Sequence, residues 1–294
     1  MLCHIVLIDR YFYYFCPALK GMDKNRNIDI MGIVNVTDDS FYSSSRCRDA
    51  GAAIDRIVAM VAEGADIIDL GACSSRPGSY GVGPEEEWRR LEPVLKEFRK
   101  AFPTLRLSVD TYWSDVVRRT YDLVGDFIVN DISAGEDDPG MLPVVAELGL
   151  VYVAMHKKGN PEDMQSKAVY DNVTEEVTGY FNKFSVKASE IGIKEWILDP
   201  GFGFAKTIEQ NYQLLNEMNH LKSVAGPGGR PPRILAGLSR KSIAYRFLGI
   251  GPEDSLPATQ VLHVAALRNG ADILRVHDVA EALRTVTLYR ALDL

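Results

Sequence analysis

Short apolar runs rich in β-branched residues alternate with longer stretches of helical periodicity throughout the chain after residue 28. This alternation is typical of repeated strand–helix units around a parallel sheet. Eight such units in one chain of 294 residues predict the α/β class and a single (β/α)8 TIM barrel. The predicted strands cover residues 29–37, 65–73, 105–111, 126–133, 150–156, 195–201, 233–239 and 271–277.

The first 28 residues stand apart from this alternation. Residues 2–19 are apolar and aromatic, but Asp9 and Arg10 interrupt them and no basic region precedes them, which argues against a signal peptide. We expect an N-terminal extension over residues 1–28, forming a short hairpin or a cap, and a barrel domain over residues 29–294. No apolar run is long enough to predict a membrane-spanning helix, so no membrane partner is expected.

Charge and cysteine spacing limit the partners further. Forty acidic against thirty-three basic residues leave a formal net charge of −7, which is unlike a phosphate-backbone binding surface, so no nucleic acid partner is expected. The four cysteines contain no C-x-x-C pair, which argues against a disulfide framework and a thiolate zinc site. This pattern favours a reducing, cytoplasmic location.

Local signals mark where the helices begin and end. Pro84 and the acidic run 85–87 predict a helix start, because acidic side chains are favourable at a helix N-terminus, and this reading is preferred to a metal site. Glycines at the ends of five predicted helices supply left-handed residues shortly before the next strand. They are Gly64, Gly125, Gly149, Gly192 and Gly270. The Pro/Gly-rich segment 226–232 precedes a strand and is expected at the N-terminal rim of the barrel.

Polar residues end nearly every predicted strand. The ends of barrel strands converge on one face, and that face carries the active site of barrel enzymes, so these residues predict a site. They are Asn35, residues 74–76, Asp110, Asn130 with Asp131, His156, Asp199, residues 239–241, and Arg275 with His277.

The chemistry of these residues falls into two groups. Asp110, Asn130 and Asp199 offer acceptors and one amide donor to a flat heterocycle with several N–H groups, such as a pterin or purine edge. For each carboxylate, pairing with a neighbouring Lys or Arg is an equally good reading. The cations Arg76, Lys241, Arg275 and His277 suit a phosphate or a pyrophosphate.

Two loops add detail to this site. Residues 239–242 are expected to start a helix directly after a strand, so that Ser239 and the free backbone N–H groups bind an anion. The turn 201–204 follows Asp199 and lets the backbone approach a ligand, with Phe204 placed to stack on an aromatic ring, although a tight strand–helix loop explains the turn equally simply.

The chain resembles the dihydropteroate synthase family over about residues 29–290. The matching blocks, in the family's order, are MGIVNVTDDSF (31–41), SSRPG (74–78), SVDT (108–111), NDIS (130–133), MHKKGNPEDMQ (155–165), LDPGFGFAKT (198–207), SRKS (239–242) and ADILRVHDV (271–279). The resemblance implies a (β/α)8 barrel that joins 6-hydroxymethyl-7,8-dihydropterin diphosphate to 4-aminobenzoate, releasing pyrophosphate and 7,8-dihydropteroate. It also implies a homodimer and inhibition by sulfonamides, which mimic 4-aminobenzoate.

The resemblance also assigns roles to residues. It implies that Asn35 is the Mg²⁺ ligand beside the diphosphate and that Lys241, Arg275 and His277 are catalytic. The residues implied for the pterin diphosphate are Ser75, Asp110, Asn130, Asp199, Lys241, Arg275 and His277. For 4-aminobenzoate we expect the carboxylate at the helix start near Ser239 and the ring near Phe204 and Pro77, with Phe41 closing over it from the first loop. Arg76 is expected to bind this substrate as well.

Two loops depart from the family's pattern. Asp38 replaces a proline, Ser43 replaces an acid, Cys73 stands where glutamate is common, and Ser75 stands for threonine. Cys73 is read as a small packing residue, since no paired histidine lies near it in the sequence. Two other readings stay open. A pterin-binding methyltransferase would share the barrel and the pterin contacts without needing the cations, and a pterin-binding pseudoenzyme or regulator would bind without turnover.

Overall fold

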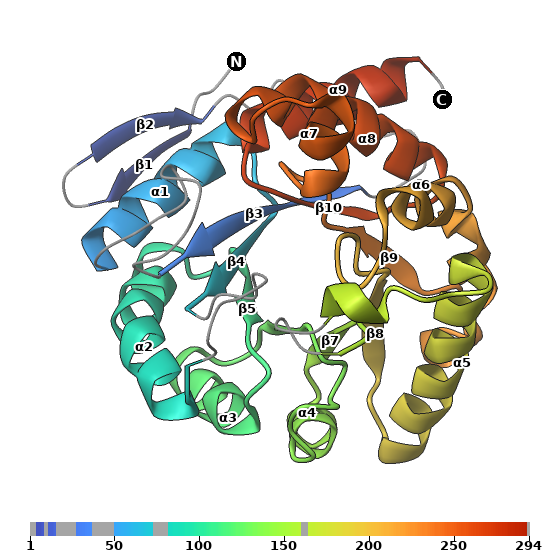
Figure 1. Ribbon diagram of the computed structural model, residues 1–294. Helices are drawn as coiled ribbons and strands as arrows, with labels where there is room; N and C mark the ends of the chain where they lie inside the picture. Colours follow the sequence, from blue (N-terminus) through green and yellow to red (C-terminus); the bar gives the residue numbers. More distant parts are fainter. Residues whose placement is uncertain are drawn as a thin grey trace.

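Eight parallel strands close into a barrel in the order β10-β3-β4-β5-β6-β7-β8-β9, as predicted (Figure 1). The computed structural model describes residues 4–8, 11–15, 28–36, 50–72, 82–159 and 164–292. The barrel strands are β3 (Asp29–Asn35), β4 (Ile67–Gly71), β5 (Arg106–Asp110), β6 (Ile128–Asp131), β7 (Val151–Met155), β8 (Glu195–Asp199), β9 (Arg233–Ala236) and β10 (Ile273–Val276). Each lies inside its predicted range.

Helices surround the barrel and connect its strands (Figure 1). They are α1 (Ala50–Glu63), α2 (Pro84–Ala101), α3 (Ser114–Val124), α4 (Met141–Leu148), α5 (Val173–Ile191), α6 (Ile208–Asn216), α7 (Ser242–Leu248), α8 (Leu256–Arg268) and α9 (Val279–Ala291). Short 3-10 turns are η3 (Met164–Lys167), η4 (Met218–Ser223), η5 (Pro227–Gly229) and η6 (Glu253–Ser255). The seven-residue helix α7 is an addition to the repeating pattern, inserted between β9 and α8.

The helix start predicted at Pro84 and the five predicted helix-end glycines are confirmed. Helix α2 begins at Pro84 with the acidic residues in its first turn. The five glycines predicted before strands all have positive φ, which Gly adopts without the steric cost that a Cβ imposes. Gly149 and Gly192 are left-handed caps of α4 and α5. Glu87, the last residue of the acidic run, is buried, and burial raises its pKa to about 8, so it is not the surface charge that the run suggested.

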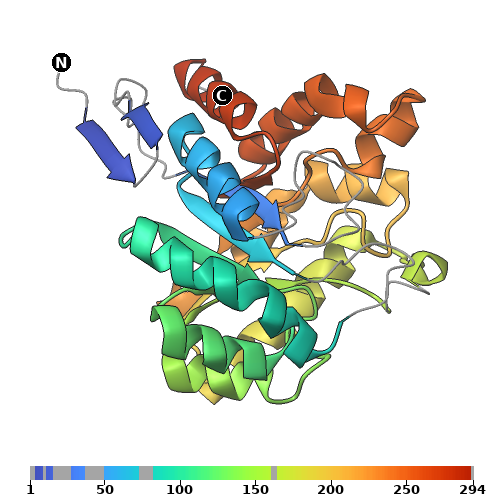
Figure 2. The same ribbon diagram turned by 90° about the vertical axis from the view of Figure 1, so that its left-hand side faces the viewer.

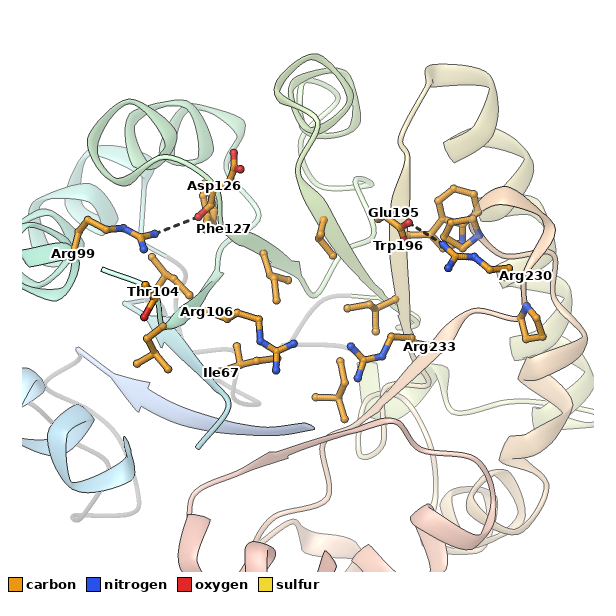
Figure 3. Close-up of a pocket in the computed structure, with 18 residues that line it drawn as sticks. Ile67, Arg99, Thr104, Arg106, Asp126, Phe127, Glu195, Trp196, Arg230 and Arg233 are labelled. Carbon is orange, nitrogen blue, oxygen red and sulfur yellow. Dashed lines mark hydrogen bonds and ion pairs between the residues drawn. The ribbon is translucent and has the colours of Figure 1, made fainter. Parts of the chain in front are cut away.

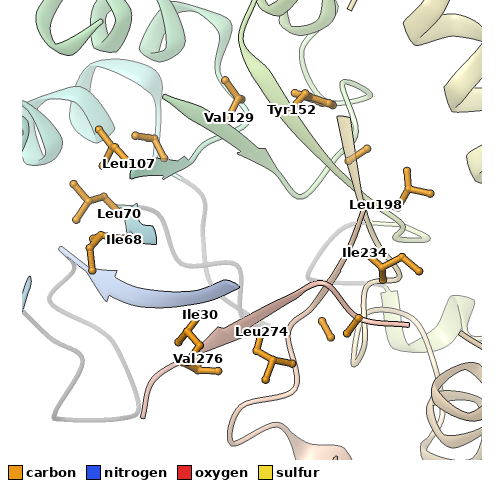
Figure 4. Close-up of a cluster of buried hydrophobic side chains, with 14 of the residues drawn as sticks. Ile30, Ile68, Leu70, Leu107, Val129, Tyr152, Leu198, Ile234, Leu274 and Val276 are labelled. Carbon is orange, nitrogen blue, oxygen red and sulfur yellow. The ribbon is translucent and has the colours of Figure 1, made fainter. Parts of the chain in front are cut away.

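Strand alternation divides the core into two regions. One set of strand side chains points outward against the helices, among them Ile68, Val129, Tyr152 and Leu198 (Figure 4). The alternate set fills the barrel interior with a separate apolar cluster. That cluster contains Met31, Ile67, Ile128, Val153, Ile197, Leu235 and Ile273.

A pocket of about 540 Å³ opens at the N-terminal ends of the strands (Figure 3). Its lining includes Pro227, Arg230 and Pro231 of the Pro/Gly-rich segment, which confirms the predicted position of that segment at the N-terminal rim. Arg106 and Arg233, the first residues of β5 and β9, point into the pocket. This face lies opposite the strand ends that carry the polar residues.

The two arginines share one buried carboxylate. Asp29 accepts bonds of 2.6 and 2.9 Å from Arg106 and 2.7 Å from Arg233. Burial alone would raise the pKa of Asp29, but the two guanidinium groups outweigh it and lower that pKa. The pairing therefore ties together the beginnings of β3, β5 and β9, which are distant in the sequence.

We expect Asp29→Asn to lower the free energy of unfolding by about 1.5–3 kcal/mol, the range for hydrogen bonds to charged groups. Since the pKa of Asp29 is lowered on folding, its contribution is present above the ordinary carboxyl value of 3.8 and is lost as pH falls through the folded value. Urea unfolding at pH 7 and pH 3 measures both effects. An equal loss at the two pH values would contradict the pairing.

The N-terminal strands form a separate sheet. β1 (His4–Ile8) and β2 (Tyr11–Phe15) pair antiparallel, and Figures 1 and 2 show them outside the helical ring, beside α1. Across the described part of the chain, no helix has both the length and the apolar character needed to cross a membrane.

Candidate active site

A polar layer lies above the apolar interior of the barrel. Strand residues two positions apart face the same side, so the residues that follow the interior cluster by two positions also point inward. Ile128 is followed by Asn130, Ile197 by Asp199, and Ile273 by Arg275. By the same rule Ile67 is followed by Asp69, and Asp110 ends β5 beside Asn130. The structure thus brings Asp110, Asn130, Asp199 and Arg275 to one face, as predicted.

Asp69 is at the centre of this layer. Its side chain is fully buried and accepts hydrogen bonds from Arg275 Nε at 2.7 Å, Ser108 Oγ at 2.6 Å and Asn130 Nδ2 at 3.2 Å. Because a carboxylate only accepts, the bond from Asn130 Nδ2 to Asp69 fixes the orientation of the Asn130 amide. Asn130 Oδ1 is then the acceptor atom of that amide. Arg275 also donates to Asp110 Oδ2 at 2.7 Å.

Arg275 therefore organises the carboxylates as well as adding positive charge. Burial alone would lower its pKa, but Asp69 and Asp110 outweigh it and raise the pKa above its ordinary value. Burial raises the pKa of Asp110, and the Arg275 guanidinium opposes that change. The expected division between carboxylates for the heterocycle and cations for the diphosphate is thus incomplete, because Arg275 belongs to both groups.

Asp199 and Lys241 form the other half of the layer. Asp199 Oδ1 accepts from the backbone N–H of Gly201 at 2.8 Å, and Lys241 Nζ donates to the carbonyl of Phe202 at 2.5 Å. Burial raises the pKa of Asp199 and lowers the pKa of Lys241 to about 8, while each group's charge favours the other's ionised form. Lys241 Nζ also lies 4.9 Å from the centroid of the Phe204 ring.

Two glycines leave room beside these groups. A Cβ on Gly237 would lie 3.7 Å from Lys241 Nζ and 4.0 Å from Asp199 Oδ2. A Cβ on Gly71, at the end of β4, would lie 3.3 Å from Asn35 Oδ1 and 3.7 Å from Asp110 Oδ2. A glycine at such a point allows a ligand to approach the backbone closely. Asn35 is thus adjacent to the carboxylate half of the layer.

Strand alternation removes two of the predicted strand-end residues from the site. Asp131 follows Asn130 and so points outward, where it accepts from Tyr152 Oη at 2.6 Å and from the backbone N–H groups of Ser133 and Gly135. His156 likewise packs its ring against Tyr180 of α5, with ring centroids 5.0 Å apart. Both are structural residues of the layer between barrel and helices.

The expected helix start at Ser239 is wrong. Helix α7 begins at Ser242 with Lys241 as its N-cap, because Arg240 adopts φ of 52°, which a helix cannot continue. Ser239 is buried, and its Oγ accepts from the His277 backbone N–H at 3.2 Å and lies 3.1 Å from His277 Nδ1. Ser239 and His277 therefore lie together after β9 and β10.

Some predicted residues fall outside the described part of the chain. These are Phe41, Ser75, Arg76 and Pro77, together with the variable positions Asp38, Ser43 and Cys73. In contrast, two buried residues were not predicted: Asp69, which belongs to the polar layer, and Lys206, which contacts His156 and the turn after β8. Asp69 lies in the middle of β4 rather than at its end. Its charge within the apolar run IIDLG nevertheless indicates a buried polar group that needs a partner.

The fold and this polar layer define a class of protein. The barrel has carboxylates, an amide and buried cations at the carboxyl ends of its strands, and the sequence matches a family model described as "Pterin binding enzyme" over residues 31–277. The chain is 38% identical over 264 residues to dihydropteroate synthase of Escherichia coli strain K12, which covers 89% of this chain and 90% of the relative.

Solved structures give the same result. Yersinia pestis dihydropteroate synthase with a sulfonamide drug complex has a TM-score of 0.83 and 33% identity, covering 91% of this chain and 94% of the other. Burkholderia cenocepacia dihydropteroate synthase complexed with 7,8-dihydropteroate has a TM-score of 0.81 and 30% identity, covering 100% and 98%. The chain belongs to the pterin-binding enzymes and, within them, to the dihydropteroate synthase family.

Proposed function

We propose that the protein is a dihydropteroate synthase, a transferase of folate biosynthesis that joins 6-hydroxymethyl-7,8-dihydropterin diphosphate to 4-aminobenzoate. The observation that supports this most is the polar layer, in which carboxylates and an amide lie beside Arg275 and Lys241 above an apolar floor. The Burkholderia relative binds the product of this reaction, and the Yersinia relative binds a sulfonamide. The same reaction and the same inhibitor class are proposed here.

Each group has a role in this reaction. Asp110, Asp199 and Asn130 Oδ1 accept from the pterin N–H groups, and Arg275, Lys241 and His277 bind the diphosphate. The amine of 4-aminobenzoate attacks the pterin methylene carbon, and the bond between that carbon and the diphosphate oxygen breaks. Pyrophosphate leaves, and the new secondary amine loses a proton to solvent. The main contribution of the cations is to stabilise the negative charge on the departing pyrophosphate. Phe204 contacts the ring of 4-aminobenzoate, with Phe41, Arg76 and Pro77 from the first two loops and Ser239 near its carboxylate.

The Mg²⁺ proposal concerns Asn35. Its Oδ1 lies 3.3 Å from the position that a Cβ on Gly71 would take, and oxygen is the ligand that Mg²⁺ prefers. Among the described residues no group of three His, Cys, Asp or Glu side chains could hold a metal, so the diphosphate and water would supply the remaining ligands. When bound, the ion would neutralise charge on the leaving group.

We also propose a homodimer that works in the cytoplasm. Large apolar side chains are exposed on α7, α8 and α9, which lie side by side in Figure 1. They include Phe247, Leu248, Val261 and Leu288, with exposed fractions of 54–69%. Apolar patches of this kind favour a protein interface, and sedimentation of Val261→Asp beside wild type tests it.

The deciding measurement is a synthase assay with Mg²⁺ and both substrates. We expect pyrophosphate release from the pterin diphosphate only when 4-aminobenzoate is present, and inhibition by a sulfonamide that competes with 4-aminobenzoate. A methyltransferase would bind a pterin lacking the diphosphate equally well and release no pyrophosphate. A pseudoenzyme or regulator would bind the pterin diphosphate without turnover, and either result would overturn the proposal.

A further inference from the structure

Lys206 is a buried lysine that the proposed chemistry does not use. It follows the turn 201–204 after β8, and only 3% of its surface is exposed. Its Nζ lies 3.0 Å from His156 Nδ1, 3.0 Å from the carbonyl oxygen of Gly201 and 3.1 Å from that of Phe204. These partners come from the loop after β7 and from both ends of the turn.

The three partners match the three N–H donors of an ammonium group. His156 can accept at Nδ1 only as a neutral ring with its proton on Nε2. Burial lowers the pKa of His156 to about 2, and the charges of Lys206 and Lys158 act in the same direction, so the ring is neutral at physiological pH. Removing the ammonium group would leave two carbonyls and a ring nitrogen without this donor.

The turn that Lys206 holds has an unusual backbone. Gly201 and Gly203 have φ of 68° and 84°, and Ala205 has φ of 49°, which is costly for a residue with a Cβ. A Cβ on Gly201 would lie 2.0 Å from the His156 carbonyl oxygen, so the turn is pressed against the loop after β7. Such a backbone persists only where its surroundings over-determine it.

The same turn carries groups that face the substrates. Asp199 precedes it, the carbonyl of Phe202 accepts from Lys241, and the ring of Phe204 lies beside Lys241 Nζ. Lys206 and Lys241 thus hold the turn through different carbonyls, Lys241 at Phe202 and Lys206 at Gly201 and Phe204. The positions of Phe204 and Lys241 depend on this arrangement.

We propose that Lys206 is a positioning residue, which fixes the turn 201–204 against His156 and thereby sets the Phe204 ring that receives 4-aminobenzoate. The assignment of that substrate rests on the proposed function. Lys206 does not touch substrate. It acts through the turn on the second substrate more than on the pterin, because the pterin acceptors Asp110, Asn130 and Asp199 are carried by the strands β5, β6 and β8, whereas Phe204 is carried by the turn itself.

The kinetic test is Lys206→Met, which keeps the length of the side chain and removes the donors. We expect KM for 4-aminobenzoate to rise about 10- to 100-fold, which corresponds to the loss of one or two hydrogen bonds to a charged group. KM for the pterin diphosphate should change less than about threefold. Lys206→Gln, which keeps two N–H donors, should recover part of the loss and replaces Lys206→Met if that variant does not fold. Lys187→Met, at an exposed lysine on α5, is the matched control.

The pH dependence separates positioning from a general loss of structure. Burial lowers the pKa of Lys206 to about 7, with Asp199 opposing and Lys241 and Lys158 adding to the change. Above that pH one donor is lost, so KM for 4-aminobenzoate in the wild type should rise through pH 7. In Lys206→Met this rise should be absent, while any change from Lys241 near pH 8 should remain.

A spectroscopic arm does not depend on catalysis. In 15N-labelled wild type, His156 should show the Nε2–H form with Nδ1 shifted upfield by its donor, and Lys206→Met should move that resonance downfield. Absence of turnover in wild type would overturn the proposed function and leave this arm intact. An unchanged His156 resonance, or equal KM increases for both substrates, would overturn the role of Lys206.

Discussion

Arg275→Met should lower the free energy of unfolding by about 3–5 kcal/mol and abolish measurable synthesis. Removing one partner of a buried ion pair leaves the other charge uncompensated, and Asp69 is fully buried with Arg275 as its ion-pair partner. Asp110 loses the same guanidinium group, so the acceptor surface for the pterin is disordered as well. Urea unfolding gives the stability and the coupled assay gives the activity.

A double variant separates the two effects. Adding Asp69→Asn to Arg275→Met removes the uncompensated charge, so part of the lost stability should return while activity stays absent. Arg275→Lys should keep the charge but lose the forked geometry that reaches two carboxylates, and it should be intermediate in stability. If Arg275→Met folds as stably as wild type, the pairing with Asp69 does not have the importance assigned to it here.

Asp199→Asn is expected to weaken binding of the pterin diphosphate by about 10- to 150-fold, which corresponds to the 1.5–3 kcal/mol of a charged hydrogen bond. The fold should remain intact. Burial disfavours the ionised Asp199 carboxylate and raises its pKa, so the amide avoids that cost, and this gain offsets the lost attraction to Lys241. Calorimetric titration with a pterin analogue and urea unfolding measure the two quantities.

The matched control is Asp254→Asn, the same change at an exposed residue of η6. It should alter neither the affinity for the pterin analogue nor the free energy of unfolding. Asp110→Asn should resemble Asp199→Asn in affinity but cost more stability, since Asp110 is bonded to Arg275. Unchanged pterin affinity in both variants would remove this face of the barrel from the proposed site.

Much of the fold could be predicted from the sequence, because each barrel strand is a short apolar run rich in β-branched residues and is followed by a stretch of helical periodicity. All eight barrel strands lie inside their predicted ranges, and the helix-end glycines have the expected backbone. The predicted positions of Asp110, Asn130, Asp199 and Arg275 on one face are also confirmed, since a closed parallel barrel gathers strand ends whatever their order in the sequence.

Contacts between particular side chains could not be predicted from the sequence in the same way. Asn130 and Asp131 are adjacent polar residues, and only the phase of strand alternation directs the first into the barrel and the second toward Tyr152. The turn at Arg240 moved the start of α7 beyond Ser239 for a reason of backbone conformation that residue type does not reveal.

The sequence by itself determined the barrel, the face that bears the site and the chemical types of the groups on it, because these depend on local periodicity and on residues at strand ends. The tertiary structure alone decided that Asp69 joins Arg275, 206 positions away, and that Lys206 joins His156, 50 positions away. Barrel closure sets the first pair, because it places β4 and β10 on either side of β3. The pairing of β7 with β8 sets the second, because it brings the loops after these two strands together. Burial then makes an unpaired charge costly enough to fix each contact.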